Sequence, residues 1–237
     1  MNLGVTPIIG HKNKVSMDRR DFIKKATMAA AATAVVSPVS AMLNSVTGKK
    51  CKVLLVNGSP RPDGNTFCCL QEIEATLQKH GIETEIVQIG QQPVRMCINC
   101  GGCHRNGGKG CIVGTPVYYG QPNGGILALM QRLFFSAGHL VQNKPAAALA
   151  VCRRGGATAT LQTMNMMFEM MNMPVVTSQY WNIAYGAGKG EVKRDTEGMQ
   201  TMRTLANNMA FLLQKIHADG DSVPQRDERP QFMNFIR

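Results

Sequence analysis

The sequence predicts an α/β fold in which a doubly wound parallel sheet forms the middle of three layers. Two observations predict it. Apolar runs alternate with helical patterns along most of the chain, which is the order expected of βαβ units. The first apolar run, at 53–56, is a continuous stretch of valine and leucine, typical of a strand covered on both faces. That strand passes directly into a Gly/Ser/Asn/Thr loop that opens a helix.

The elements follow in chain order from apolar periodicity. The first strand is expected at 52–58 and the first helix at 66–80, where Leu70, Ile73 and Leu77 fall on one helical face. The remaining strands, read from short apolar runs, are expected at 84–89, 112–116, 145–152 and 173–179. The remaining helices are expected at 123–138, 157–171 and 197–217. In such a sheet the ligand binds at the carboxyl ends of the strands.

The loop after the first strand has the residue types that bind an anion. Its hydroxyl, amide and guanidinium side chains are Ser59, Arg61, Asn65 and Thr66. Gly58 and Gly64 let backbone N–H groups approach a ligand closely, and the dipole of the following helix favours negative charge. The loop has neither the G-x-G-x-x-G spacing nor the G-K-[ST] ending, so a mononucleotide phosphate is the better interpretation.

Four segments resemble motifs of one known family: NGSPRPDGNT (57–66), TPVYYG (115–120), YWN (180–182) and GEVKRDTEG (190–198). The family is the flavodoxin-like NADPH-dependent FMN reductases and iron–sulfur flavoproteins, and the resemblance spans roughly residues 50–216. It implies a flavodoxin-like sheet and non-covalent FMN, with the phosphate at Ser59, Arg61, Asn65 and Thr66. It also implies that Pro116, Val117, Tyr118, Tyr119 and Gly120 line the flavin ring; ordinary packing is the alternative for the two tyrosines.

The resemblance also indicates a shortening. Relatives place an acidic stretch, a helix and most of a central strand between the last cysteine of the motif and the P-V-Y segment. Here Cys111 is separated from Pro116 by four residues. The chain is therefore expected to lack about one βα unit after Cys111, with a central strand of only 112–115 and the loop 90–110 as the crossover.

Four of the eight cysteines share one glycine-rich loop with two-residue gaps and one longer gap: Cys97, Cys100, Cys103 and Cys111. This spacing resembles the ferredoxin-type run without its trailing proline, and the family resemblance implies a four-iron four-sulfur cluster. Disulfides or free thiols are one alternative, and zinc is another. The other four, Cys51, Cys68, Cys69 and Cys152, are interpreted as small buried hydrophobes.

The N-terminal segment closely resembles a twin-arginine export signal. Arg19-Arg20 precedes a weakly apolar stretch at 26–36 and an A-x-A-like cleavage site ending at Ala41. The apolar stretch is too short for a stable membrane span. We expect a signal at 1–41, a flavodoxin-like FMN-binding domain at 42–218, a C-terminal tail at 219–237, and a periplasmic or otherwise exported protein. A retained amphipathic helix is the alternative.

Composition and charge narrow the partners. The formal net charge is +11, but part of it lies in the N-terminal segment and the rest forms no dense basic run, which disfavours nucleic acid. The methionines between Met164 and Met173 are interpreted as core or dimer-face residues rather than metal ligands, and a homo-oligomer is expected. The loop at 153–156 is interpreted either as a flavin or substrate contact or as a solvated loop.

The sequence therefore favours an FMN-dependent oxidoreductase or electron-transfer flavoprotein. We expect it to carry the cluster and to exchange electrons with a redox partner protein or a small-molecule acceptor. An NAD(P)H-dependent FMN or quinone reductase without a cluster is the second hypothesis. A non-catalytic binding module with the same fold is the third. The pattern identifies no catalytic residue.

Overall fold

The computed structural model describes residues 51–91 and 109–218, together with residues 224, 228 and 231. Several predictions from the sequence fall outside these residues. They are the export signal at 1–41, the ligands Cys97, Cys100 and Cys103, and most of the tail at 219–237.

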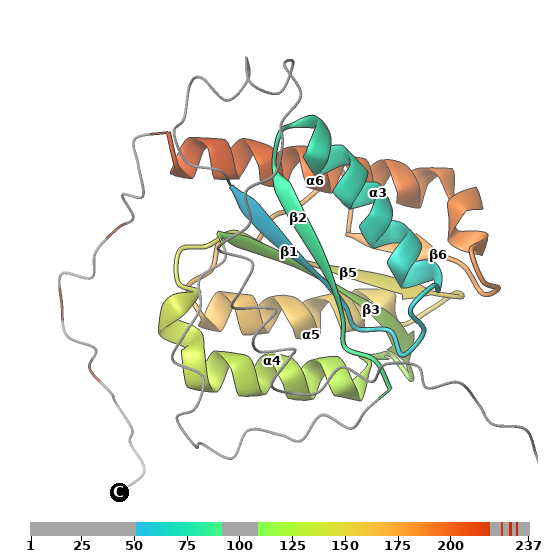
Figure 1. Ribbon diagram of the computed structural model, residues 1–237. Helices are drawn as coiled ribbons and strands as arrows, with labels where there is room; N and C mark the ends of the chain where they lie inside the picture. The colour runs from blue at the N-terminus through green and yellow to red at the C-terminus, as the bar shows by residue number, and fades with distance from the viewer. Residues whose placement is uncertain (1–50, 92–108, 219–223, 225–227, 229–230, 232–237) are drawn as a thin grey trace, which may run out of the picture. The chain divides into compact units, whose positions relative to one another are not determined.

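The described residues form a parallel sheet in the order β2-β1-β3-β5-β6. Its strands are β1 (Lys52–Asn57), β2 (Glu83–Gln88), β3 (Gly110–Tyr118), β5 (Ala146–Cys152) and β6 (Ile183–Tyr185). A two-residue strand, β4 (Gln121–Pro122), pairs antiparallel with the end of β3. The order is that of the flavodoxin-like doubly wound sheet, so the predicted fold class is confirmed (Figure 1).

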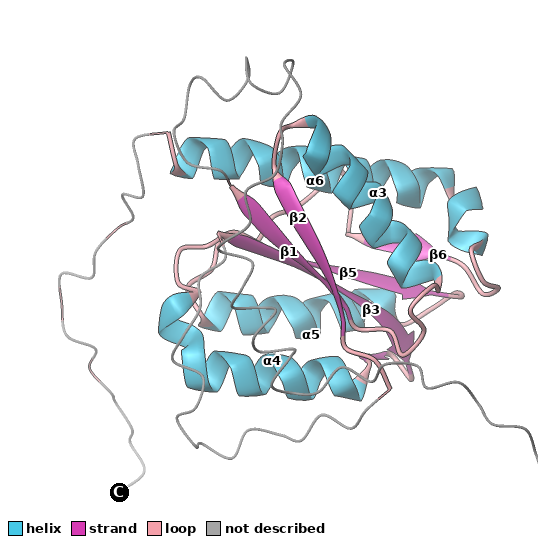
Figure 2. Cartoon of the chain, viewed as in Figure 1, coloured by secondary structure: helices cyan, strands magenta, loops and turns pink. Residues whose placement is uncertain are grey.

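Helices cover both faces of this sheet (Figure 2). On one face lie α3 (Asn65–Lys79) and α6 (Thr196–Ile216), and on the other lie α4 (Gly124–Ala137) and α5 (Ala157–Met170). Two short 3-10 helices, η2 (Gly138–Leu140) and η3 (Glu191–Arg194), follow α4 and precede α6. The expected three-layer arrangement follows from this pairing of helices.

Each face of the sheet has its own apolar core. Leu55 and Leu70 are fully buried between the sheet and the α3–α6 layer, while Phe134 and Phe168 pack edge to face in the α4–α5 layer. Strand β5, with the sequence AAALAVC, is buried along its whole length. Its alanines bury little area each, but they let the helices of both layers approach the middle of the sheet closely.

The central strand is longer than the sequence analysis expected. β3 runs from Gly110 to Tyr118 and pairs with β1 on one side and β5 on the other. The expected short strand at 112–115 is therefore wrong. The sheet of the described residues also has the five parallel strands that the flavodoxin-like order requires, because β3 is a full-length strand that begins at Gly110.

The strand expected at 173–179 is also wrong. Only Val175 in that stretch forms an isolated bridge, with Ala146, and the fifth parallel strand is β6. Pro174 lacks a backbone N–H, and the side-chain amide of Asn182 donates to the carbonyl of Ala148 at 3.0 Å where a strand would place a backbone donor. Regular pairing resumes only at Ile183.

The remaining cysteine and methionine predictions are mostly confirmed. Cys68, Cys69 and Cys152 are buried free thiols, and Cys51 is partly buried. Met164 and Met173 lie in the core, whereas Met166 and Met170 are exposed on α5. No helix in the described ranges combines the length and the apolar character needed to cross a bilayer.

Candidate functional site

The carboxyl ends of the parallel strands all lie at one edge of the sheet, and β1 and β3 are neighbours there. The chain leaves β1 into α3 on one face and leaves β3 toward α4 on the other. Strand order reverses at this point, which is where ligands bind in doubly wound folds. The loop that joins β1 to α3 is the anion-binding loop expected from the sequence.

The start of this loop is fixed against the middle of β3. The Gly58 N–H donates to the carbonyl of Gly114 at 2.7 Å, and a Cβ at Gly58 would lie 2.7 Å from that same oxygen. Asn57, at the end of β1, is fully buried; its side-chain oxygen accepts from the Ser59 N–H, and its amide donates to Gln88. The loop is therefore held in place before any ligand arrives.

The N-terminus of α3 is open. Its N-cap residue is Gly64, so no side chain caps the first N–H groups, and the first turn contains no acidic residue. A Cβ at Gly64 would lie 3.8 Å from the Ser59 hydroxyl and 3.4 Å from the Arg61 Cβ. A methyl group there would fill the space between loop and helix. This cradle, with free N–H donors and a positive dipole end, has the chemistry of a phosphate site.

The predicted side chains of the loop differ in their roles. The Ser59 hydroxyl accepts from the Arg61 N–H at 3.1 Å, while the Arg61 guanidinium is exposed and pairs with no residue of the described segments. Thr66 is buried, and the absence of a side chain at Gly114 makes room for its methyl group. Arg61 is thus the cation of the loop that is free to bind an anion.

Asn65 has a second role that the sequence did not indicate. Its amide donates to the Gly188 carbonyl at 2.9 Å, and its side-chain oxygen accepts from the Val192 N–H at 3.3 Å. Lys189 of the same loop forms an ion pair with Asp63. Asn65 therefore joins the anion-binding loop to the segment that follows β6.

The predicted ring-lining segment forms a tight hairpin at the end of β3. Tyr118 pairs with Gln121, and the two turn residues Tyr119 and Gly120 both have positive φ, 52° and 76°. This is the geometry of a type I′ turn. Tyr119 is fully exposed at its tip, while Pro116 and Val117 are partly buried in β3.

The loop that follows β5 packs against this hairpin. A Cβ at Gly156 would lie 2.7 Å from the Gly120 Cα, so the N-terminus of α5 contacts the turn directly. Arg153 and Arg154 precede it and are exposed. The structure thus brings together the ends of β1, β3 and β5, which carry every predicted flavin contact.

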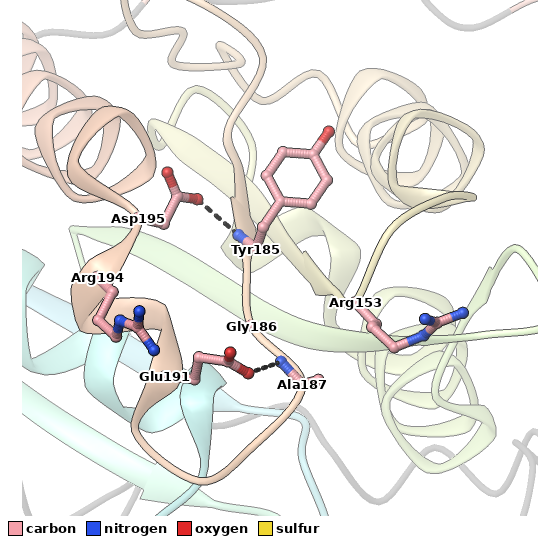
Figure 3. Close-up of a pocket in the computed structure, with 7 residues that line it drawn as sticks. All are labelled: Arg153, Tyr185, Gly186, Ala187, Glu191, Arg194 and Asp195. Atoms are coloured by element: carbon pink, nitrogen blue, oxygen red, sulfur yellow. Dashed lines mark hydrogen bonds between the residues drawn. The ribbon is translucent and has the colours of Figure 1, made fainter.

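A cavity of about 390 Å³ lies beside these strand ends, where β5 and β6 finish (Figure 3). It is lined by Arg153, Tyr185, Gly186, Ala187, Glu191, Arg194 and Asp195. Backbone N–H groups of Gly188 and Ala187 lower the pKa of Glu191. Burial, together with the nearby Cys152 and Tyr180, raises the pKa of Tyr185, so this phenol is neutral near pH 7.

Cys111 lies at the end of β3 opposite to the predicted flavin contacts. It is the second residue of β3, where it pairs with Leu54 of β1 and with Ala146, the first residue of β5. It therefore lies near the amino ends of the strands. Burial raises the pKa of its thiol to about 12, while the charge of Lys144 acts in the opposite direction. The described segments contain no cluster of three or more metal-ligating side chains, and Cys111 is the one predicted cluster ligand within them.

The sequence analysis did not single out Tyr185, Gly186 or Ala187, and it gave no role to Glu191, Arg194 and Asp195, which lie in the GEVKRDTEG motif. A signal was present, because AYGAGKGE at 184–191 is a glycine-rich loop after an apolar stretch. Placing the last strand at 173–179 instead of Ile183–Tyr185 put this loop away from the carboxyl edge.

Comparisons with known proteins show the family to which the chain is similar. A family model described as NADPH-dependent FMN reductase matches residues 51–188. The chain is 30% identical over 190 residues to an iron–sulfur flavoprotein of Methanocaldococcus jannaschii, covering 70% of this chain and 98% of that protein. An iron–sulfur flavoprotein of Methanosarcina thermophila is 29% identical over 196 residues, with 72% and 99% covered. The structure of a flavodoxin, WrbA-like protein from Agrobacterium tumefaciens has a TM-score of 0.53 at 14% identity, covers 70% of this chain and 99% of its own, and shows the fold alone.

Proposed function

Because the chain belongs to the NADPH-dependent FMN reductase family, and is thus an FMN-dependent oxidoreductase or electron-transfer flavoprotein, we propose that it is an exported protein carrying both FMN and a four-iron four-sulfur cluster. It exchanges electrons with a redox partner protein or a small-molecule acceptor. Bound FMN would supply the electron-transfer chemistry, and the chain supplies binding and orientation. The open N-terminus of α3, beside the unpaired Arg61, is the observation that carries the FMN part of this proposal.

The phosphate of FMN fits the cradle between Ser59 and the N-terminus of α3. The N–H groups of the first turn and the Arg61 guanidinium supply donors, and Gly64 leaves the space that the phosphate needs. Asn65 and Thr66 frame this cradle, Asn65 by holding the loop after β6 and Thr66 by packing on Gly114. The hairpin from Pro116 to Gly120 and the loop before α5 border the place left for the ring.

The cluster rests on the spacing of Cys97, Cys100, Cys103 and Cys111 and on the names of the iron–sulfur flavoproteins that the chain resembles. Burial raises the pKa of the Cys111 thiol to about 12 and the charge of Lys144 opposes this only in part, so Cys111 would have to release its proton on binding iron, as thiol ligands do. The second hypothesis, a cluster-free NAD(P)H-dependent reductase, is supported by the family description alone.

A homo-oligomer is supported by the outer surface of the α4–α5 layer. Helix α4 is apolar nearly all round, which is typical of a helix covered on every side. Large apolar side chains remain exposed on the two helices: Leu133, Phe135, Met166 and Met170. A second copy of the chain would cover them. Export is supported by the Arg19-Arg20 segment.

The proposal is tested with anaerobically purified protein. We expect flavin absorbance bands with a broad iron–sulfur shoulder, whereas flavin bands alone would favour the cluster-free reductase. Replacing Arg61 with Ala should weaken FMN binding by about 1.5–3 kcal/mol, the contribution of one charge-assisted hydrogen bond. Fluorescence titration measures this, and an unchanged FMN affinity would remove Arg61 from the site.

A further inference from the structure

The cavity at the ends of β5 and β6 has a rigid wall. The Glu191 carboxylate accepts from the N–H groups of Ala187 and Gly188 at 2.8 and 2.7 Å. Asp195 accepts from Tyr185 N–H at 2.7 Å and caps α6 through Gly198 N–H at 2.9 Å. Both carboxylates thus accept hydrogen bonds from backbone N–H groups. Figure 3 shows the bond from Ala187 to Glu191 and the bond from Tyr185 to Asp195.

The two cations of the cavity form no salt bridge within the described segments. Neither the Arg153 nor the Arg194 guanidinium forms a close ion pair or a hydrogen bond with another described side chain, and both are exposed, although the charge of Arg194 contributes to lowering the pKa of Glu191. Elsewhere in the described segments, Arg203 pairs with Glu72 at 2.7 Å. In Figure 3 the Arg194 side chain extends toward Glu191, while the Arg153 side chain lies on the opposite side and points away from the other lining residues. An unpaired guanidinium at a concave surface is a binding group for phosphate, sulfonate or carboxylate.

One aromatic side chain lines the cavity together with these cations. Tyr185 lines the cavity and is 47% exposed. Just before β6, the rings of Tyr180 and Trp181 lie 5.0 Å apart, and both are more than half exposed. Aromatic faces beside guanidinium groups suit a planar ligand that carries a negative charge.

The cavity is also a neighbour of the proposed flavin site. Asn65 at the phosphate cradle holds the loop that forms one wall, and Gly186 fits against the Asn65 amide so closely that a Cβ would lie 2.9 Å from its nitrogen. Arg153, on the other wall, begins the loop that packs against the Tyr119–Gly120 turn. A ligand in the cavity would therefore lie beside the edge where FMN is proposed to bind.

We infer that this cavity binds the anionic group of the second redox substrate, a planar compound that carries a phosphate, sulfonate or carboxylate, and that Arg194 is the principal contact. This inference rests on the proposed function. Arg194 determines specificity for the charged group and takes no part in holding FMN, whose phosphate is assigned to the cradle beside Arg61.

The test uses Arg194→Ala, with Lys193→Ala as its matched control. Lys193 lies next to Arg194 on η3, is equally exposed and does not line the cavity, so both variants lose one positive charge. The probes form two pairs that differ in charge: anthraquinone sulfonate against uncharged hydroxymethyl anthraquinone, and NADPH against NADH. Binding is measured on the FMN-containing protein by quenching of Trp181, the single tryptophan of the chain.

We expect Arg194→Ala to weaken the charged member of at least one pair about tenfold, with the uncharged or less charged member unchanged and FMN content normal. A selective loss of anthraquinone sulfonate identifies a quinone-like acid, and a selective loss of NADPH identifies the additional phosphate. Arg194→Lys should recover part of the affinity, and added salt should weaken only the charged probes.

Two results would overturn the inference. One is that Arg194→Ala and Lys193→Ala bind all four probes alike. The other is that Arg194→Ala loses FMN as Arg61→Ala does, since the cavity would then belong to the flavin site. Because quenching of Trp181 reports probe binding directly, a protein without FMN would refute the proposed function while the cavity could still be titrated.

Discussion

The two glycines of the phosphate loop should respond in opposite ways to the same substitution. At Gly58 a new Cβ would meet the Gly114 carbonyl oxygen at 2.7 Å and the Ile126 Cβ at 2.9 Å. A backbone oxygen in the middle of a sheet cannot move aside, so β3 or the loop must shift. At Gly64 the nearest atom, the Arg61 Cβ, would lie 3.4 Å away, which is ordinary contact.

From these distances we estimate how much each substitution changes the free energy of unfolding and the Tm. Overpacking a close-packed site costs about 1–3 kcal/mol, and the reduced freedom of the unfolded chain returns about 0.4–1 kcal/mol. Gly58→Ala should therefore lose about 1–2 kcal/mol of unfolding free energy, which lowers Tm by about 2–8 °C in a chain of this length. Gly64 has φ −84° and ψ −173°, which alanine adopts freely, so Gly64→Ala should leave the Tm of the FMN-free protein nearly unchanged.

The two variants should also differ in how much added FMN raises their Tm. The Gly64 methyl group would occupy the cradle near the Ser59 hydroxyl, so Gly64→Ala should reduce the stabilisation that added FMN gives, measured as the shift in Tm with ligand concentration. Differential scanning fluorimetry with and without FMN checks both variants. A wild-type Tm for Gly58→Ala would refute the close-approach reasoning, and a full FMN shift for Gly64→Ala would refute the cradle.

Three other predictions test export, the cluster and the loop after β6. Arg19→Lys combined with Arg20→Lys should block export, because the pathway reads the guanidinium pair; normal periplasmic recovery would contradict this. Anaerobic reconstitution should give about four irons per chain, and Cys100→Ser should lose them; near-zero iron with the four cysteines in disulfides would favour the cluster-free reading. The hydrogen bonds that lower the pKa of Glu191 stabilise the folded state above its ordinary value of 4.5, and this stabilisation is lost as the pH falls through the lower, folded value. The difference in Tm between wild type and Glu191→Gln should therefore shrink in acid, and a constant difference would contradict the assignment.

The sequence was sufficient where a residue's role is set by its neighbours in the chain. The strand at 52–58, the loop and the helix at 66–80 correspond to β1, the Gly58–Gly64 turn and α3 within a residue or two. Apolar runs and the glycines between them are enough to specify a strand–loop–helix unit from local sequence. The expectation that this loop binds an anion rests on the same residues and stays a prediction.

Contacts between distant segments could not be predicted in this way. Asn65 was expected at a phosphate, but its amide bonds residues more than 120 positions later in the chain. Asn182 replaces a backbone donor of the last strand, so an apolar pattern at 173–179 failed to become a strand. In both cases a side-chain amide forms a bond whose partner only the tertiary fold brings near.

The two proposed cofactor sites lie at opposite edges of the same sheet, and this has a consequence for assembly. Cys111 lies near the amino end of β3, while Tyr118, at the other end of that strand, borders the flavin edge. Seven residues of parallel strand span about 23 Å. Cys111 must contact its cluster directly, so a cluster held by one chain lies well away from the flavin edge of that chain. A second copy, docked so that its flavin edge meets the Cys111 edge of the first, would shorten that path, and the exposed apolar side chains of α4 and α5 offer the surface for such a dimer. If so, Phe135→Glu should produce monomers that keep both cofactors but exchange electrons between them slowly. A monomer in which the two cofactors equilibrate as fast as in wild type would show that one chain suffices.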